Sequence, residues 1–122
     1  MKTVLVVDDF QVTRNVMQSS LEKLDIVTIT AADGEEAISK LIDSSKVDLL
    51  ITDLNMPKKN GIELTQFVRN DSIYGMLPIL LLTTDISKEK KQAALNNGVT
   101  AILSKPYDSK QFQMIVKKLL KI

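Results

Sequence analysis

Five short runs of apolar residues alternate with stretches in which apolar residues recur at helical spacing. The runs are Val4–Val7, Ile26–Ala31, Leu49–Ile51, Ile79–Leu82 and Ala101–Leu103. Continuous aliphatic runs are typical of strands buried on both faces, as in a parallel sheet. The stretches between them place apolar residues three or four positions apart, and the last does so from Phe112 to Ile122. The pattern therefore predicts five strand-then-helix units.

Turn-forming residues separate the predicted elements. Asp33-Gly34 precedes the second predicted helix, and Asn97-Gly98 follows the fourth. Right-handed crossovers between parallel strands require helices on both faces of the sheet, and five units are too few to close an eight-stranded barrel. We therefore predict one α/β domain, residues 1–122, with an open, doubly wound (βα)5 parallel sheet in three α/β/α layers.

The 122 residues include neither cysteine nor histidine. This excludes disulfides, thiolate and imidazole metal sites, cysteine nucleophiles and histidine-based triads. Polar chemistry must therefore come from carboxylates, hydroxyls, amides and lysines. The apolar run after Lys2 is too short for a secretory signal or a membrane span, so we expect a cytoplasmic protein without membrane association.

Charge is unevenly distributed, although the net charge is only +1. Residues 1–85 carry 8 Lys/Arg against 13 Asp/Glu, whereas residues 86–122 carry 8 against 2. The basic segment contains no nucleic-acid recognition motif, so no direct nucleic-acid contact is expected. It either meets an acidic partner or forms an ordinary solvated helix face.

Polar side chains follow the predicted strands at their carboxyl ends, where open α/β sheets bind ligands. These strand-end residues are Asp8 and Asp9, then Asp53, then Thr83, Thr84 and Asp85, and finally Lys105. Taken singly, several have ordinary structural explanations: a helix cap for Asp9, an Asx-turn for Asp53, strand propensity for Thr83 and a solvated rim position for Lys105.

Taken together, these residues indicate phosphoryl transfer. Three carboxylates held close together repel one another unless a counter-charge is present. Mg2+ provides such a charge, prefers oxygen ligands and commonly joins protein carboxylates to a substrate phosphate. A lysine and a hydroxyl would bind the other phosphoryl oxygens. Asp53, on the central strand, is the natural acceptor of an aspartyl phosphate.

The ordered set of strand-end motifs resembles the receiver domain of two-component response regulators. The matching segments are Val6–Phe10, Asp53–Pro57 with Gly61, Leu82-Thr83 and Lys105-Pro106. Separations of 44, 30 and 22 residues between successive members of Asp9, Asp53, Thr83 and Lys105 also resemble those of single-domain chemotaxis regulators. The resemblance covers essentially the whole chain and implies the flavodoxin-like strand order 2-1-3-4-5.

The resemblance implies a role for each matching position. Asp8 and Asp9 correspond to an acidic pair that binds Mg2+ together with the phosphoacceptor, Asp53, and the backbone carbonyl of Asn55. Thr83 corresponds to the hydroxyl that bonds the phosphoryl group, and Lys105 to the lysine that pairs with it, ahead of a cis peptide bond to Pro106. The phosphodonor is then a histidine kinase, and the protein is not an enzyme but assists its own phosphorylation and dephosphorylation.

Three positions depart from the usual family pattern. Ile102 replaces the aromatic residue three positions before the lysine, so activation is expected to rely on loop and backbone shifts. Thr84 replaces a residue that is usually very small, and we expect its extra bulk to narrow the access of phosphodonors or hydrolytic water to the site. Asp85, together with Asn55, lies near the expected path of the attacking water, and we hypothesise that this pair tunes the lifetime of the phosphoryl group.

The family's usual output surface is formed by the fourth helix, fifth strand and fifth helix, which coincide here with the basic segment. The lysines predicted to form it are Lys88, Lys90, Lys91, Lys110, Lys117 and Lys118. We expect a monomer that docks an acidic or amphipathic segment of a target, such as a flagellar-switch or kinase component, and that is also a substrate for a phosphatase.

Four other functions remain open at this stage. The chain is alternatively a phosphorelay intermediate or a receiver-like adaptor that works without phosphorylation. A haloacid-dehalogenase-type phosphatase also forms an aspartyl phosphate, but it needs a second aspartate where Asn55 stands. A flavodoxin-like binder needs a Gly/Ser/Thr phosphate loop at the position of Asp8 and Asp9.

Overall fold

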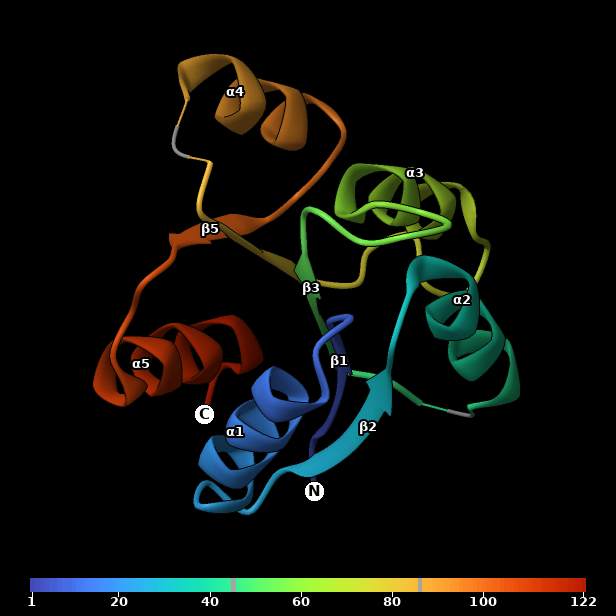
Figure 1. The fold of residues 1–122 in the computed structure, drawn as a ribbon. Coiled ribbons are helices and arrows are strands. Elements are labelled where there is room, and N and C mark those ends of the chain that lie inside the picture. The colour runs from blue at the N-terminus through green and yellow to red at the C-terminus, as the bar shows by residue number, and fades with distance from the viewer. Residues whose placement is uncertain (45, 86) are drawn as a thin grey trace.

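The computed structural model describes residues 1–44, 46–85 and 87–122. Its five parallel strands form one sheet in the order β2-β1-β3-β4-β5, which confirms the predicted topology (Figure 1). The strands are β1 (Thr3–Val7), β2 (Val27–Ala31), β3 (Leu49–Asp53), β4 (Ile79–Thr83) and β5 (Ala101–Ser104). The helices are α1 (Gln11–Glu22), α2 (Gly34–Asp43), α3 (Gly61–Asn70), α4 (Lys88–Asn96) and α5 (Ser109–Leu120).

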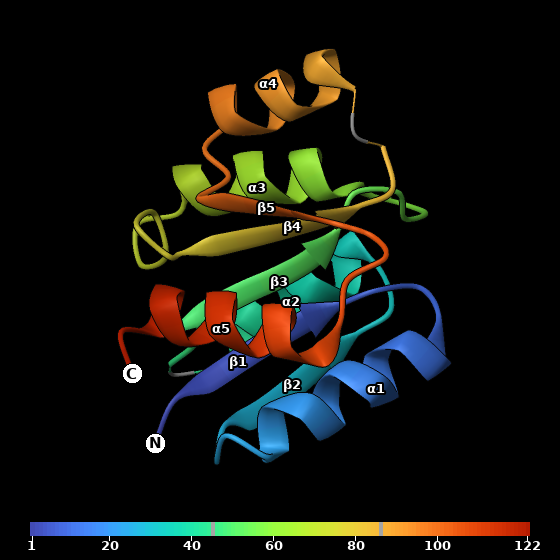
Figure 2. The same cartoon turned by 90° about the vertical axis from the view of Figure 1, so that its left-hand side faces the viewer.

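Helices cover both faces of the sheet, with α1 and α5 on one face and α2, α3 and α4 on the other (Figures 1 and 2). Successive side chains of a strand point to opposite faces, so Leu5 and Val7 join the core under α2 and α3. Val4 and Val6 join the second core, under α1 and α5. Burial on both faces explains why the inner strands are continuously apolar. In the described part of the chain, no helix is long and apolar enough to cross a bilayer.

Two details differ from the sequence prediction. The edge strands β2 and β5 are only partly buried, and Val27 is 44% exposed, so burial on both faces holds for the three inner strands alone. The predicted periodicity to Ile122 also runs too far, because α5 ends at Leu120 and Lys121 adopts a left-handed conformation. Ile122 is consequently exposed.

The parallel register brings the carboxyl ends of the strands to one edge of the sheet. Val7 of β1 pairs with Thr52 of β3, while Asp53 pairs with Leu82 of β4. Both termini of the chain lie at the opposite edge (Figure 2). The last residues of β1, β3, β4 and β5, together with those that immediately follow them, therefore converge at this edge.

Candidate functional site

Three aspartates gather at the carboxyl edge of the sheet. One carboxylate oxygen each of Asp8, Asp9 and Asp53 lies within 4.8 Å of the other two. Asp8 is fully buried directly after β1, Asp53 is half-buried at the end of β3, and Asp9 is exposed. The structure thus confirms that strands distant in sequence bring these carboxylates together.

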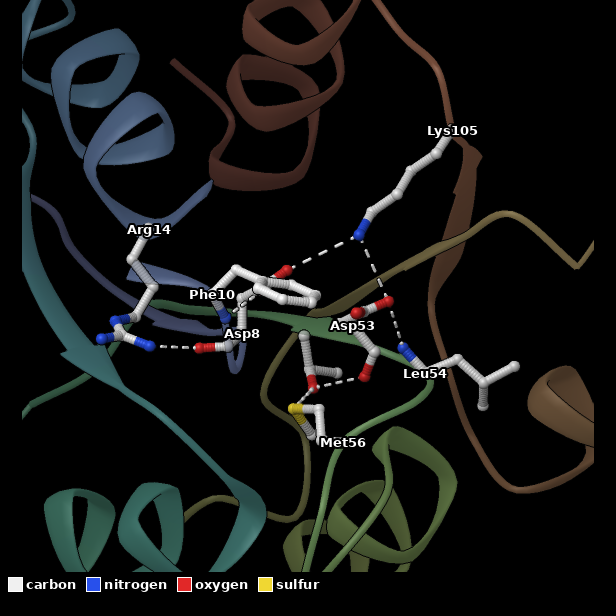
Figure 3. Close-up of polar contacts among 8 residues, drawn as sticks. Asp8, Phe10, Arg14, Asp53, Leu54, Met56 and Lys105 are labelled. Atoms are coloured by element: carbon white, nitrogen blue, oxygen red, sulfur yellow. Dashed lines mark hydrogen bonds and ion pairs between the residues drawn. The ribbon is translucent and has the colours of Figure 1, made fainter. Parts of the chain in front are cut away.

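Lys105 reaches into this cluster from the end of β5 (Figure 3). Its Nζ atom lies 3.5 Å from Asp8 Oδ2 and 3.4 Å from Asp53 Oδ1. Its side chain is 22% exposed, so the alternative of a solvated rim lysine is wrong. The peptide bond between Lys105 and Pro106 is cis, as the family resemblance implied.

Backbone donors hold the two least exposed carboxylates. Asp8 Oδ1 accepts the Phe10 N–H at 2.9 Å, and Asp53 Oδ1 accepts the Leu54 N–H at 2.9 Å. Asp8 Oδ2 is buried and has no hydrogen-bond partner within the described ranges. The capping alternative for Asp9 is wrong, because the N-cap of α1 is Phe10 and has no side-chain cap.

Burial and neighbouring charges set the electrostatics of Asp53. Burial raises the pKa of its carboxyl, the Lys105 ammonium opposes this rise, and the negative charge of Asp8 adds to it. Among the described residues, one lysine pairs with two of the three clustered carboxylates, which leaves the cluster with excess negative charge. Among the described residues, Asp8, Asp9 and Asp53 are the side chains that could hold a cation.

The last residue of β4 and the residues that follow it make contacts among themselves. Thr83 is buried, and its Oγ1 accepts the Asp85 N–H at 2.9 Å. Asp85 Oδ1 accepts the Ser87 N–H at 3.0 Å, and this hydrogen bond lowers the pKa of the Asp85 carboxyl. Thr84 is exposed. In this structure, then, the Thr83 hydroxyl and the Asp85 carboxylate are engaged with the loop that leads to α4.

Asn55 and Ile102 occupy different surroundings. Asn55 is exposed in the loop after β3. Ile102 is half-buried on β5 and packs against the core under α2, α3 and α4. It therefore has a packing role on the face opposite α1 and α5.

The predicted output lysines lie on the two helices that flank β5 (Figure 1). Lys91 is half-buried; the exposed ones are Lys88, Lys90, Lys110, Lys117 and Lys118. A groove of about 520 Å³ runs between β5 and α5. Lys118 lines it beside the apolar side chains of Leu103, Met114 and Leu119.

Two residues near the aspartate cluster were not predicted from the sequence. Arg14 of α1 donates from Nη1 to the carbonyl oxygen of Asp8 at 2.6 Å (Figure 3). Tyr107 stacks on Phe112 with ring centroids 5.5 Å apart, and burial together with the charges of Asp8 and Asp53 raises the pKa of its hydroxyl. An arginine on an amphipathic helix carries no signal in a sequence, whereas Tyr107 could have been suspected from its place two residues after Lys105.

Comparisons with known proteins agree with this geometry. Chemotaxis protein CheY1 of Helicobacter pylori is 37% identical over 105 residues, which cover 85% of each chain. The Bacillus subtilis regulator PhoP, named for alkaline phosphatase synthesis, is 35% identical over 98% of this chain and 49% of its own length. The crystal structure of chemotaxis response regulator CheY4 from Vibrio cholerae superposes with a TM-score of 0.92 at 37% identity, covering 98% of both chains.

The family description "Response regulator receiver domain" matches residues 4–117, which is nearly the whole chain. The match includes every strand-end residue of the cluster and all of the five-stranded sheet except Thr3, the first residue of β1. The chain therefore belongs to the response regulator receiver family, the phosphoacceptor modules of two-component signalling.

Proposed function

We propose that Asp53 accepts a phosphoryl group from a histidine kinase in the presence of Mg2+, and that the phosphorylated protein signals by docking to a target. The observation that carries this proposal is the position of Lys105 Nζ, within 3.5 Å of both Asp8 and Asp53. A lysine held there is placed to pair with a phosphoryl oxygen on Asp53.

The donor set fits a hard divalent cation. All of its side-chain ligands are carboxylate oxygens, and the buried Asp8 Oδ2 has no hydrogen bond from the described residues. Buried polar atoms normally have a hydrogen-bond partner, whereas Asp8 Oδ2 has, among the described residues, only the ion pair with Lys105 at 3.5 Å, which leaves it lone pairs to offer to a cation. Asp8, Asp9, Asp53 and the Asn55 carbonyl would hold the ion, which would neutralise the cluster and polarise the phosphoryl group.

In the proposed reaction, a carboxylate oxygen of Asp53 attacks the phosphorus of the donor. A new O–P bond forms while the P–N bond to the donor's histidine breaks, and the released imidazole takes a proton. The chain contains no histidine, so this donor is another protein. Lys105 pairs with one phosphoryl oxygen. The Thr83 hydroxyl gives up the hydrogen bond that it accepts from the Asp85 N–H and donates to another phosphoryl oxygen. Water later attacks the phosphorus, the bond between phosphorus and the Asp53 carboxyl oxygen breaks, and inorganic phosphate leaves, which restores the carboxylate.

Incubation with acetyl phosphate and Mg2+, followed by intact mass measurement, tests this function. We expect the mass of the protein to increase by one phosphoryl group. When Mg2+ is chelated before acetyl phosphate is added, we expect no increase in mass. An adaptor that works without phosphorylation would gain no mass, and a phosphatase would turn over an external phosphomonoester. Either result would contradict the proposal.

A chemotaxis role and a flagellar-switch target form the finer part of the proposal. The similarity to proteins named as chemotaxis regulators supports them. The groove between β5 and α5 suits an amphipathic segment with acidic residues, because Lys118 lies among its apolar lining residues and α5 also carries the exposed Lys110 and Lys117. Phosphorylation would favour the docking-competent form of this surface.

Charge reversal at two output lysines should weaken docking. We expect Lys117→Glu with Lys118→Glu to lower the affinity of the phosphorylated protein for a flagellar-switch protein of the same genome by about tenfold, mainly through slower association. The measurement is binding kinetics at low and high salt. Lys23→Glu, an exposed position at the end of α1, is the control. An affinity that changes neither with the double substitution nor with the salt concentration would contradict an electrostatic docking surface.

Asn55 and Asp85 should tune the lifetime of the phosphoryl group. A group that orients the attacking water speeds hydrolysis, so we expect Asn55→Ala and Asp85→Ala to lengthen the lifetime several-fold. The effect of Asp85→Ala should be the smaller one, because its carboxylate is already bonded to the Ser87 N–H. The measurement is the loss of phosphate after the donor is removed, with exposed Asn15→Ala on α1 as the control. Unchanged rates in both variants would end this hypothesis.

A further inference from the structure

The turn between β1 and α1 carries two of the three cluster aspartates, yet it lacks the usual helix cap. Helices commonly begin at a Ser, Thr, Asp or Asn whose side chain bonds the first turn. Here the N-cap is Phe10, with no side-chain cap hydrogen bond, and the first turn of α1 contains no acidic residue. The position of Asp8 and Asp9 must therefore be fixed by other contacts.

Three hydrogen bonds fix Asp8 instead. Its N–H donates to the Ala31 carbonyl at 3.1 Å, and its Oδ1 accepts the Phe10 N–H at 2.9 Å. Its carbonyl oxygen accepts from Arg14 Nη1 at 2.6 Å, a short and charge-assisted bond. Figure 3 shows the guanidinium reaching back from α1 to this carbonyl, on the side of Asp8 away from Asp53.

These bonds determine where the remaining carboxylate oxygen of Asp8 points. Oδ2 is buried, lacks a hydrogen bond from any described residue, and lies 3.5 Å from Lys105 Nζ. Asp9 is the next residue along the same turn, so the bond from Arg14 to the Asp8 carbonyl acts on the peptide group that joins the two aspartates. Holding that peptide group orients both carboxylates at once.

We propose that Arg14 is a positioning residue for the divalent-cation site: its bond to the Asp8 carbonyl holds the β1–α1 turn in the conformation that presents Asp8 and Asp9 to the cation. This inference rests on the proposed cation site. Groups that orient metal ligands from outside the coordination sphere typically change metal affinity by about 10- to 100-fold when removed.

Charge and positioning predict opposite effects for the loss of Arg14. Arg14 is itself a cation, so removing its charge should strengthen Mg2+ binding if electrostatic repulsion were its main effect. If Arg14 positions the turn, removing it should weaken Mg2+ binding, because the ligands are no longer pre-oriented. The sign of the change therefore separates the two roles.

Calorimetric titration of the full chain with Mg2+ alone, without phosphodonor, tests the inference. We expect Arg14→Met, which keeps an unbranched side chain but removes the charge and the donors, to bind Mg2+ about tenfold more weakly. Arg14→Lys keeps the charge and one donor, and should restore affinity to within about threefold of the original. Lys23→Met removes one exposed charge near the other end of the same helix and should leave affinity unchanged.

Mg2+ binding by Arg14→Met that is as tight as in the original chain, or tighter, would overturn the inference while leaving the cation site intact. Failure of the unsubstituted chain to bind Mg2+ would instead overturn the site and the inference with it. Urea unfolding without Mg2+ checks that the compared variants are folded. If Arg14→Met does not fold, Arg14→Gln takes its place, because glutamine is uncharged and its amide donor lies on a shorter side chain. Arg14→Gln should also bind Mg2+ more weakly than Arg14→Lys.

Discussion

Replacement of Lys105 by methionine is expected to slow phosphorylation by acetyl phosphate by about 10²-fold, the usual effect of losing one pre-positioned donor at a site of developing charge. Lys105 Nζ lies 3.4 Å from Asp53 Oδ1, so it is already placed beside the atom that would receive the phosphoryl group. Methionine keeps a side chain of similar length without the charge. The measurement is the rate of phosphate incorporation, followed by intact mass at saturating Mg2+.

The same substitution should strengthen Mg2+ binding. Lys105 also lies 3.5 Å from Asp8 Oδ2, and its positive charge competes with a cation for the three carboxylates. Slower phosphorylation together with tighter Mg2+ binding is a combination that general loss of structure does not produce. Lys23→Met, at an exposed lysine that follows α1 and has no assigned role, is the control. An unchanged phosphorylation rate in Lys105→Met would contradict the role proposed for this lysine.

Gly61→Ala is expected to lower the free energy of unfolding by about 1–2 kcal/mol and to slow phosphorylation. A Cβ atom at Gly61 would lie 2.5 Å from the Asp53 carbonyl oxygen and 2.8 Å from Leu81 Cδ1. The Gly61 N–H also donates to the Leu54 carbonyl at 2.9 Å, so the helix start cannot simply move away. Overpacking costs about 1–3 kcal/mol, and a contact with a backbone oxygen, which cannot rotate away, belongs to the upper part of this range, about 2–3 kcal/mol. Subtracting the gain of roughly 1 kcal/mol when alanine replaces glycine in a helix leaves about 1–2 kcal/mol.

Urea denaturation measures the first effect of Gly61→Ala, and acetyl phosphate labelling measures the second. Gln11→Ala, at the exposed first residue of α1, is the matched control for a substitution at a helix start. The clash falls on the backbone of Asp53 itself, so stability and labelling rate should fall together. A Gly61→Ala variant with full stability and a normal labelling rate would show that the close approach of α3 to β3 does not matter.

The chain's fold was predictable because its burial pattern is simple. The inner strands are apolar on both faces, and this pattern predicts a parallel sheet between helix layers. The exact strand order came from the family resemblance and not from the pattern. The predictions were wrong where burial weakens: Val27 on edge strand β2 is exposed, and α5 ends before Ile122. An apolar residue at an edge or a terminus gives the same sequence signal as a core residue.

The residues that form the site were predictable from the sequence, but the contacts between them were not. The rule that strand ends converge predicts from the sequence alone that Asp8, Asp53 and Lys105 lie together. It could not show that Asp8 Oδ2 is buried without a hydrogen bond from the described residues, or that Thr83 Oγ1 accepts the Asp85 N–H. These depend on side-chain rotamers and loop geometry. Arg14 went unnoticed for the same reason, because its bond joins a helix side chain to a backbone carbonyl.

The central claim, that Asp53 carries the phosphoryl group, is tested most directly by locating the modified side chain. The chain and its Asp53→Asn variant are incubated with Mg2+ and acetyl phosphate, treated with borohydride to reduce any acyl phosphate to an alcohol, and mapped by peptide mass spectrometry. We expect homoserine at position 53 of the original chain and no reduced residue in the variant, since an amide cannot form the acyl phosphate. Full labelling of the variant, or reduction at Asp8 or Asp9 in place of Asp53, would contradict the account.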